Sequence, residues 1–159
     1  MAEVVVSDSA NAAAFEALAA TPLLAGVKDE GLQLLAREGA LRVFAVGDWV
    51  VREGESGHSM FILMSGEVEV IKHFGEPQEV TLARLRDRTF FGEMCVVDPV
   101  PRAASVRALT EVSAIEISSG TLHRLFRQMP SEYSIFVLNL ARDLARRLRK
   151  LDEAFAAKA

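Results

Sequence analysis

Short apolar segments separated by turn-forming residues fill the middle of this sequence, and they restrict its fold more than any other feature. They occupy residues 41–46, 49–52, 60–64, 68–72, 80–85 and 104–117. Glycine, serine or aspartate lies in the intervals between them, and β-branched residues are frequent within them. Strands this short, at this regular spacing, are typical of an all-β sandwich or barrel. We therefore expect a mainly β domain.

The segments on either side of this region have helical character. Residues 11–37 are rich in alanine and leucine, and Thr21-Pro22 and Gly26 interrupt them, which predicts two or three short helices. A second helical region begins at Ser118. Pro130 should divide it, because a proline removes a hydrogen bond and clashes with the preceding helical turn. Neither glycine nor proline follows Pro130, so we expect a long terminal helix.

Composition excludes several classes of protein. With 159 residues, half of them hydrophobic, the chain can form one domain with its own core. Its net charge of −4 argues against nucleic-acid binding over the whole surface. Cys95 is the single cysteine, so no disulfide can form within the chain and a reducing compartment is expected. No basic leader precedes an apolar run, and no run approaches the roughly 18 residues of a membrane span, so we expect a cytoplasmic protein without membrane contact.

The most informative stretch, residues 90–106, lies between two strand-like segments and does not alternate. Gly92 opens a segment that can form a short helical turn before Pro99 ends it. The first turn of a helix has N–H groups without partners in the helix, which favours an anion, and a glycine allows a ligand to approach closely. Nine residues after Glu93 comes Arg102, whose guanidinium matches phosphate oxygens. Glu93 suits such a site if it accepts a hydrogen bond from a ribose 2′-hydroxyl.

This stretch resembles the phosphate-binding cassette of cyclic nucleotide-binding domains, a family found in catabolite activator proteins, protein kinase A regulatory subunits and gated channels. Other segments are similar to that family's early barrel and N-terminal helices: residues 53–57, 60–62, 65–70 and 21–24. The resemblance covers roughly residues 18–151 and implies a β-roll, a jelly-roll-like barrel, with flanking helices. We expect a single domain over residues 1–159 with these parts: an N-terminal helical bundle at 8–40, the roll at 41–117 with its cassette at 90–106, and C-terminal helices at 118–159.

The resemblance also implies roles for individual residues. Arg102 would hold the cyclic phosphate and Glu93 the ribose hydroxyl. Main-chain groups near them would complete the cage, and the expected ligand-binding residues are Phe91, Gly92, Glu93, Met94, Cys95, Arg102, Ala103, Ala104 and Ser105. In this family a threonine after the arginine is associated with cGMP. Ala103 stands there, so cAMP is the expected ligand, and no other cofactor or metal is expected. His58 replaces the family's usual aspartate and should not touch the phosphate.

Other functions remain open beside a non-enzymatic binding module. Catabolite activators carry a helix-turn-helix domain after the long helix, and we expect none before Ala159, which disfavours operator binding. An isomerase or a cyclic nucleotide hydrolase would need a catalytic constellation, which His58, His73 and His123 are too scattered to form. The chain could also be a fragment of a channel or kinase. The expected pocket would then be the same, but the partner that receives the signal would differ. A pocket that has lost its ligand is disfavoured, because both charged residues are present. Cys95 is expected to be a small buried hydrophobe.

The terminal helix carries a second signal. Its apolar residues alternate steps of four and three, the spacing of a coiled-coil seam: Val137, Ala141, Leu144, Leu148, Leu151 and Phe155. This spacing, together with the resemblance to catabolite activator proteins, implies a homodimer. Alternatively, the helix packs on the roll of its own chain or closes over the pocket as a lid. Packing and pairing are compatible, because the N-terminal half of the helix can pack on its own chain while the rest pairs with a second copy. Candidates for covering the base lie between Arg146 and Leu151. The basic cluster at 142–150 is expected to be a solvated face of this helix. We also expect that ligand binding is signalled to a separate effector protein.

Overall fold

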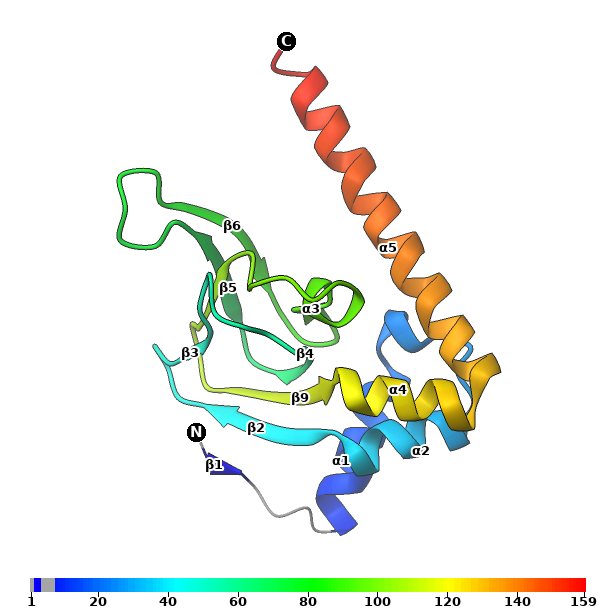
Figure 1. Cartoon of the computed structure of the whole chain (residues 1–159). Coiled ribbons are helices and arrows are strands. Elements are labelled where there is room, and N and C mark those ends of the chain that lie inside the picture. The colour runs from blue at the N-terminus through cyan, green and yellow to red at the C-terminus, as the bar shows by residue number, and fades with distance from the viewer. Residues whose placement is uncertain (1, 4–7) are drawn as a thin grey trace.

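Two antiparallel sheets make up the centre of the computed structural model, which describes residues 2–3 and 8–159. The first has the order β1 (Ala2–Glu3), β2 (Ala40–Phe44), β9 (Val112–Ser118), β4 (Ser59–Ser65) and β7 (Phe90–Phe91). The second has the order β3 (Trp49–Val51), β8 (Ser105–Ala108), β5 (Val68–Lys72) and β6 (Val80–Leu85). The expected mainly β fold with flanking helices is confirmed (Figure 1). The two sheets are not joined into one closed barrel among the described strands.

Helices flank the sheets at both ends of the chain, and one short helix lies between β7 and β8. They are α1 (Asp8–Ala19), the 3₁₀ turn η1 (Pro22–Leu24), α2 (Asp29–Glu38), α3 (Met94–Val97), α4 (Ser119–Gln128) and α5 (Pro130–Ala156). The division at Pro130 is confirmed, and Pro130 occupies the first position of α5, where a missing N–H breaks no helical bond. The expected long terminal helix is α5, with 27 residues.

The sequence of β4 explains how one strand serves two hydrophobic cores. Side chains alternate across a strand, so Met60 and Ile62 pack with the helices, whereas Phe61 and Leu63 pack between the two sheets. All four are at least 96% buried, which accounts for an apolar run without polar alternation. β7 follows the same rule, since Phe90 joins the core shared with the helices and Phe91 the core between the sheets.

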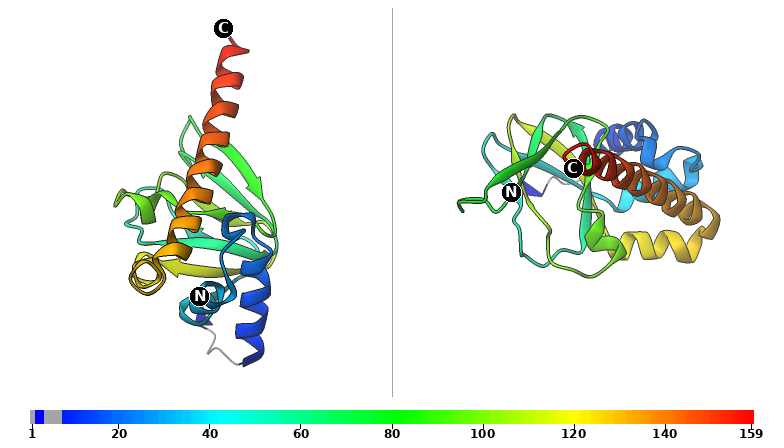
Figure 2. Two further views of the ribbon diagram at one scale, coloured as in Figure 1. Left: turned by 90° about the vertical axis from the view of Figure 1, so that its right-hand side faces the viewer. Right: turned by 90° about the horizontal axis from the view of Figure 1, so that it is seen from above.

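The first half of α5 is fixed to the rest of the chain. The Asn139 side chain donates to Leu23 O (3.0 Å) and Ala25 O (2.8 Å). The carboxylate of Glu132 accepts from the N–H of Lys28 (2.6 Å), which precedes α2. Leu140 is the last buried residue of the helix, and the C-terminal end of the helix extends away from the body of the molecule (Figures 1 and 2). Among the described residues, no helix combines the length and the apolar character needed to cross a membrane.

Two features of the sheets differ from the sequence-based expectation. The segment at 104–117 forms two strands, β8 and β9, which lie in different sheets. The strand β7 is only two residues long and had not been expected. It pairs with β4 through Phe61 opposite Phe91 and Ile62 opposite Phe90. A strand this short has no periodicity of its own, so long-range pairing alone defines it.

Candidate functional site

Arg102 lies inside the molecule, with 7% of its surface exposed, in a slot between two glycines. A Cβ atom added to Gly57 would lie 2.4 Å from Arg102 Nε, and one added to Gly92 would lie 2.6 Å from Nη1. Gly92 also has a φ of +79°, in the left-handed region that favours glycine. The guanidinium therefore packs directly against both glycines, and any larger residue at either position would displace it.

The main chain of Arg102 is held by the loop between β3 and β4. Gly54 donates its N–H to Arg102 O (2.9 Å), and the N–H of Arg102 donates to Glu55 O (2.8 Å). A third bond runs from the N–H of Glu53 to Ser105 Oγ (2.9 Å). These bonds bring together two segments about fifty residues apart in sequence, and they fix the position from which the arginine side chain enters the slot.

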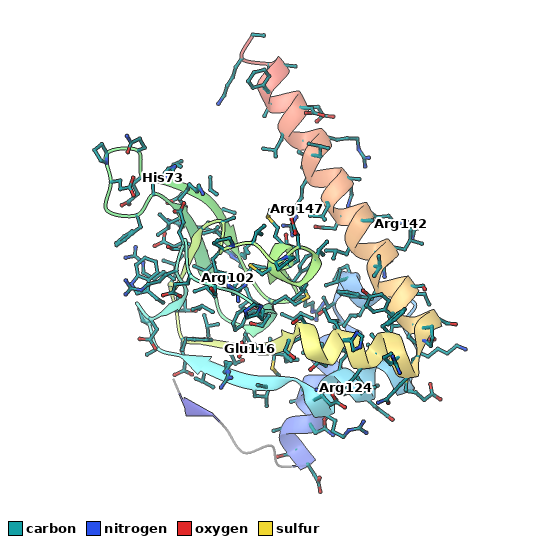
Figure 3. The ribbon with its side chains drawn as sticks, viewed as in Figure 1. His73, Arg102, Glu116, Arg124, Arg142 and Arg147 are labelled. Carbon is teal, nitrogen blue, oxygen red and sulfur yellow. The ribbon has the colours of Figure 1, made fainter. Side chains whose placement is uncertain are left out.

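The guanidinium of Arg102 uses only part of its hydrogen-bonding capacity. Nη1 donates to Ser59 O (2.7 Å) and Nη2 donates to Ser59 Oγ (3.2 Å). That hydroxyl in turn donates to Glu116 Oε1 (2.7 Å), and Glu116 pairs directly with Arg42 (2.7 Å). A guanidinium has five N–H groups, so N–H donors remain on Arg102 beyond those that Ser59 receives. Figure 3 shows Arg102 and Glu116 within the roll.

No carboxylate among the described residues forms an ion pair with Arg102. The Phe61 ring lies 5.9 Å from Arg102 Cζ and gives a weak cation–π contact. Removing a cation from water is costly unless an opposite charge compensates it. Of the other buried charged residues, Glu69 pairs with Arg107 and Glu93 with Arg147, whereas Glu132 accepts a main-chain N–H. The slot therefore presents a buried positive charge that an anionic ligand would neutralise.

Glu93 is also buried, with 6% of its surface exposed, and it immediately precedes α3. Arg147 of α5 donates to it, with 2.9 Å between Nη1 and Glu93 Oε1. The same guanidinium pairs with Asp143 (2.7 Å from Nε to Oδ2) and lies 5.0 Å from the Phe90 ring centroid. Figure 3 shows Arg147 reaching from α5 towards the cassette. Glu93 thus links the cassette to the C-terminal helix, although the two charged residues are 54 positions apart.

The apolar residues of the expected site have different environments. Phe91 is buried and its ring stacks on Phe61, with centroids 5.2 Å apart and planes 12° from parallel. Met94 is 52% exposed at the start of α3. Cys95 is a buried free thiol, as expected, and donates to Val100 O (3.4 Å). Its N–H donates to Gly92 O (3.3 Å), so that amide already has a partner within the cassette.

The end of the cassette lies beside Lys72 of β5. Lys72 Nζ donates to Ala103 O (2.5 Å) and pairs with Glu53 Oε1 (2.6 Å). Ala103 is exposed and Ala104 is half-buried, whereas Ser105 is buried at the start of β8. The hydrogen bond from Lys72, and next that from the N–H of His73, hold the pKa of the Glu53 carboxyl below its ordinary value.

Two of the residues around Arg102 were not expected to act on it. Gly57 and Ser59 lie in segments that had been noted only as parts of the roll, and their contacts with Arg102 arise from the tertiary fold. Arg147 had been expected only among the candidates for covering the base and in the basic cluster at 142–150. His58 is exposed, and its carbonyl accepts from the N–H of Ser119 (2.8 Å). Within residues 2–3 and 8–159, no cluster of three or more His, Cys, Asp or Glu side chains could hold a metal ion.

Three cavities lie around these elements. One of about 360 Å³ lies between α5, η1 and the turn from β6 to β7, and four arginines line it; we call it the arginine-lined cavity. One of about 300 Å³ lies between α3, α4 and α5. The third, of about 230 Å³, includes Trp49 and the predicted site residue Ser105. Arg102 lines none of the three, because its guanidinium is enclosed in the slot between Gly57 and Gly92.

Comparison with known proteins agrees with this fold. Residues 41–129 match the model of the family described as "Cyclic nucleotide-binding domain". A CRP-like cAMP-activated global transcriptional regulator of Mycobacterium tuberculosis is 30% identical over 141 residues, which are 89% of this chain and 61% of the relative. The chain thus spans about three fifths of that curated relative's length.

Solved structures give the same result. The Catabolite Activator Protein of Thermus thermophilus superposes with a TM-score of 0.75 at 31% identity, over 86% of this chain and 62% of that one. A cyclic nucleotide-binding domain from Methylobacillus flagellatus has a TM-score of 0.83 over 99% of this chain and 89% of that one. At 22% identity, it supports the fold alone. The family model covers more than half of the residues of this chain. The chain therefore belongs to the cyclic nucleotide-binding domain family.

Proposed function

We propose that this chain is a non-catalytic regulatory module of the cytoplasm that binds a cyclic nucleotide, with cAMP preferred over cGMP. One observation carries the proposal. Arg102 is a buried cation that packs against Gly57 and Gly92 and has no carboxylate partner among the described residues. A cyclic phosphate is a compact anion whose oxygens match a guanidinium, so it would supply the missing charge.

The second charged residue of the cassette restricts the anion to a nucleotide. Glu93 is buried close to Gly92 and would accept a hydrogen bond from a ribose 2′-hydroxyl. Ala103, exposed directly after the arginine, offers no hydroxyl to a guanine, which supports the preference for cAMP. The remaining expected contacts come from residues 91–95 and 102–105.

The contact between Glu93 and Arg147 suggests how binding would reach the C-terminal helices. A ribose that engages Glu93 competes with Arg147, or reorients it, and Arg147 belongs to α5. The cavity of about 300 Å³ lies between Val96 of α3, Leu122 of α4 and Phe136 of α5, so the cassette helix has space to move towards them. The ligand would thus shift a pre-existing equilibrium in the position of α4 and α5, and a separate effector would recognise the shifted helices.

We further propose that the distal half of α5 pairs with a second copy of this chain. The seam residues there are exposed: Leu144 at 36%, Leu148 at 59%, Leu151 at 67% and Phe155 at 82%. Exposed apolar residues in a heptad spacing are the surface that a coiled coil buries.

Isothermal titration calorimetry tests the binding proposal. Wild-type protein should bind cAMP at a single saturable site and bind cGMP more weakly. Arg102→Leu should weaken cAMP binding by about a hundredfold or more, because it removes charge-assisted hydrogen bonds to the phosphate. Arg102→Lys keeps the charge without the planar fork and should give an intermediate affinity.

Arg37→Leu is the matched control for this experiment. Arg37 is an exposed arginine of α2, and its removal should leave cAMP affinity unchanged. Circular dichroism should show the wild-type fold for each variant. Wild-type protein that binds no cAMP at millimolar concentration would refute the proposed function.

A further inference from the structure

The arginine-lined cavity borders the cassette at Phe90, but neither Arg102 nor Glu93 lines it. Arg142 and Arg146, one turn apart on α5, line one side of it, and Arg88 lines it from the turn between β6 and β7. Arg147 also lines it. Arg149 and Lys150, which belong to the same basic cluster in the sequence, do not line it. The basic cluster is therefore divided between a cavity wall and a solvated face. Figure 3 shows Arg142 and Arg147 on α5.

The charges in this cavity are unbalanced. Asp143 is the one acidic residue among its lining residues, and it already pairs with Arg147 (2.7 Å) and Arg146 (3.5 Å). Arg88 and Arg142 form no ion pair with any described carboxylate. Four arginines thus line one cavity in a chain whose net charge is −4. A cavity of this kind attracts anions.

Both walls of the cavity are held in place. The N–H of Arg88 donates to Leu63 O (3.0 Å), and the N–H of Leu63 donates to Thr89 O (2.9 Å), so the turn is fixed to β4. Arg88 has a φ of +66°, a conformation that disfavours residues with a side chain by about 1 kcal/mol or more. The opposite wall is fixed by the two hydrogen bonds from Asn139 to the segment around η1. The main chain on both sides of the cavity is therefore fixed by hydrogen bonds.

We propose that the arginine-lined cavity is a second anion site, which binds a small molecule carrying at least two phosphate groups, such as pyrophosphate or a nucleoside triphosphate. Its volume of about 360 Å³ falls in the range of small-molecule sites rather than of flat protein-docking surfaces. Arginines on both walls are engaged together only by an anion whose charge is spread over more than one group. Leu85 and Phe90 supply apolar surface for the remainder of such a ligand.

Calorimetric titration with pyrophosphate, at constant ionic strength, tests this site. Wild-type protein should bind it saturably and at least about tenfold more tightly than sulfate, because a single compact anion does not span both walls. Arg142→Gln and Arg88→Gly should each weaken pyrophosphate binding by roughly tenfold or more, through loss of a charge-assisted hydrogen bond. Glycine suits the positive φ at position 88, so Arg88→Gly removes the charge without harming the turn. Arg147 is unsuitable as a variant, since it also pairs with Glu93.

Two controls separate this site from the cassette and from general charge. Arg149→Gln removes a positive charge from the same helix outside the cavity and should leave pyrophosphate binding unchanged. Arg102→Leu, with its fold checked by circular dichroism, should also retain pyrophosphate binding, whatever its effect on cAMP. The proposal is overturned if sulfate binds as tightly as pyrophosphate. It is also overturned if Arg149→Gln weakens binding as much as Arg142→Gln, or if folded Arg102→Leu no longer binds pyrophosphate.

Discussion

At the scale of single residues, the proposed phosphate site is defined by the space around Arg102. The sequence predicted that Arg102 and Gly92 act together, because a glycine that opens a helical turn and an arginine suit a phosphate, and because this stretch resembles a phosphate-binding cassette. It did not predict that Gly57 forms the other wall of the slot, or that Ser59 accepts from the guanidinium. Those contacts join residues 43 or more positions apart, and only the pairing of the strands brings them together.

Replacing Gly92 by alanine tests the width of the slot. The new Cβ would lie 2.6 Å from Arg102 Nη1 and 3.2 Å from Ser59 O, so the guanidinium must shift. Gly92→Ala should therefore weaken cAMP binding by at least about tenfold in a calorimetric titration. Urea denaturation should show a stability loss above the roughly 1–2 kcal/mol that a left-handed alanine costs by itself.

Gly47→Ala provides the matched control. Gly47 also has a left-handed backbone, with a φ of +87°, but a Cβ there would meet nothing within 4 Å. The Gly47→Ala variant should lose only the roughly 1–2 kcal/mol that a left-handed alanine costs, and its affinity for cAMP should be unchanged. Equal effects of the two variants on binding would contradict a slot that is closed by Gly92.

At the scale of elements, the important contact is the one between the cassette helix α3 and the terminal helix α5. The sequence predicted both helices, the first from the residues between Gly92 and Pro99, and the second from the absence of glycine or proline after Pro130. It did not identify Arg147 as the partner of Glu93, because several arginines of α5 have similar local sequence. The packing of α5 against η1 and α4 selects Arg147.

A double-mutant cycle on Glu93 and Arg147 measures this contact. Arg147→Gln leaves a buried carboxylate without its cation, so it should destabilise the fold in urea denaturation. The side chain of Arg147 is 45% exposed, which screens the pair, so we expect a coupling free energy of about 1 kcal/mol with Glu93→Gln. Arg146→Gln, on the same helix, should change stability by less than about 0.5 kcal/mol, since its pair with Asp143 is exposed. Strictly additive effects of Glu93→Gln and Arg147→Gln would show that the contact does not connect the two elements.

At the scale of the whole molecule, the architecture follows from strands that are buried on both faces. The expected mainly β fold rested on short, punctuated apolar runs, and β4 and β9 show the reason, since each contributes side chains to both cores. The assignment of strands to two separate sheets could not be predicted from the sequence. Neighbouring segments such as β8 and β9 have similar composition and differ only in their long-range partners.

The exposed seam of α5 gives a prediction for the assembly. Light scattering at micromolar concentration should give twice the chain mass of 17.4 kDa. Leu148→Glu should reduce the mass to that of a monomer, because it places a charge in the apolar seam. Arg149→Glu introduces the same side chain one position away, off the seam, and should remain dimeric. A monomeric wild-type protein would contradict the proposed pairing, and α5 would then contact only its own chain.

The central claim is that the buried, unpaired guanidinium of Arg102 receives the phosphate of a cyclic nucleotide. A crystal structure of the protein with bound cAMP tests it most directly. The account predicts the cyclic phosphate within hydrogen-bond distance of Arg102, between the segments that carry Gly57 and Gly92, and the ribose 2′-hydroxyl on Glu93. A nucleotide bound in the arginine-lined cavity, with Arg102 contacting only Ser59, would contradict it.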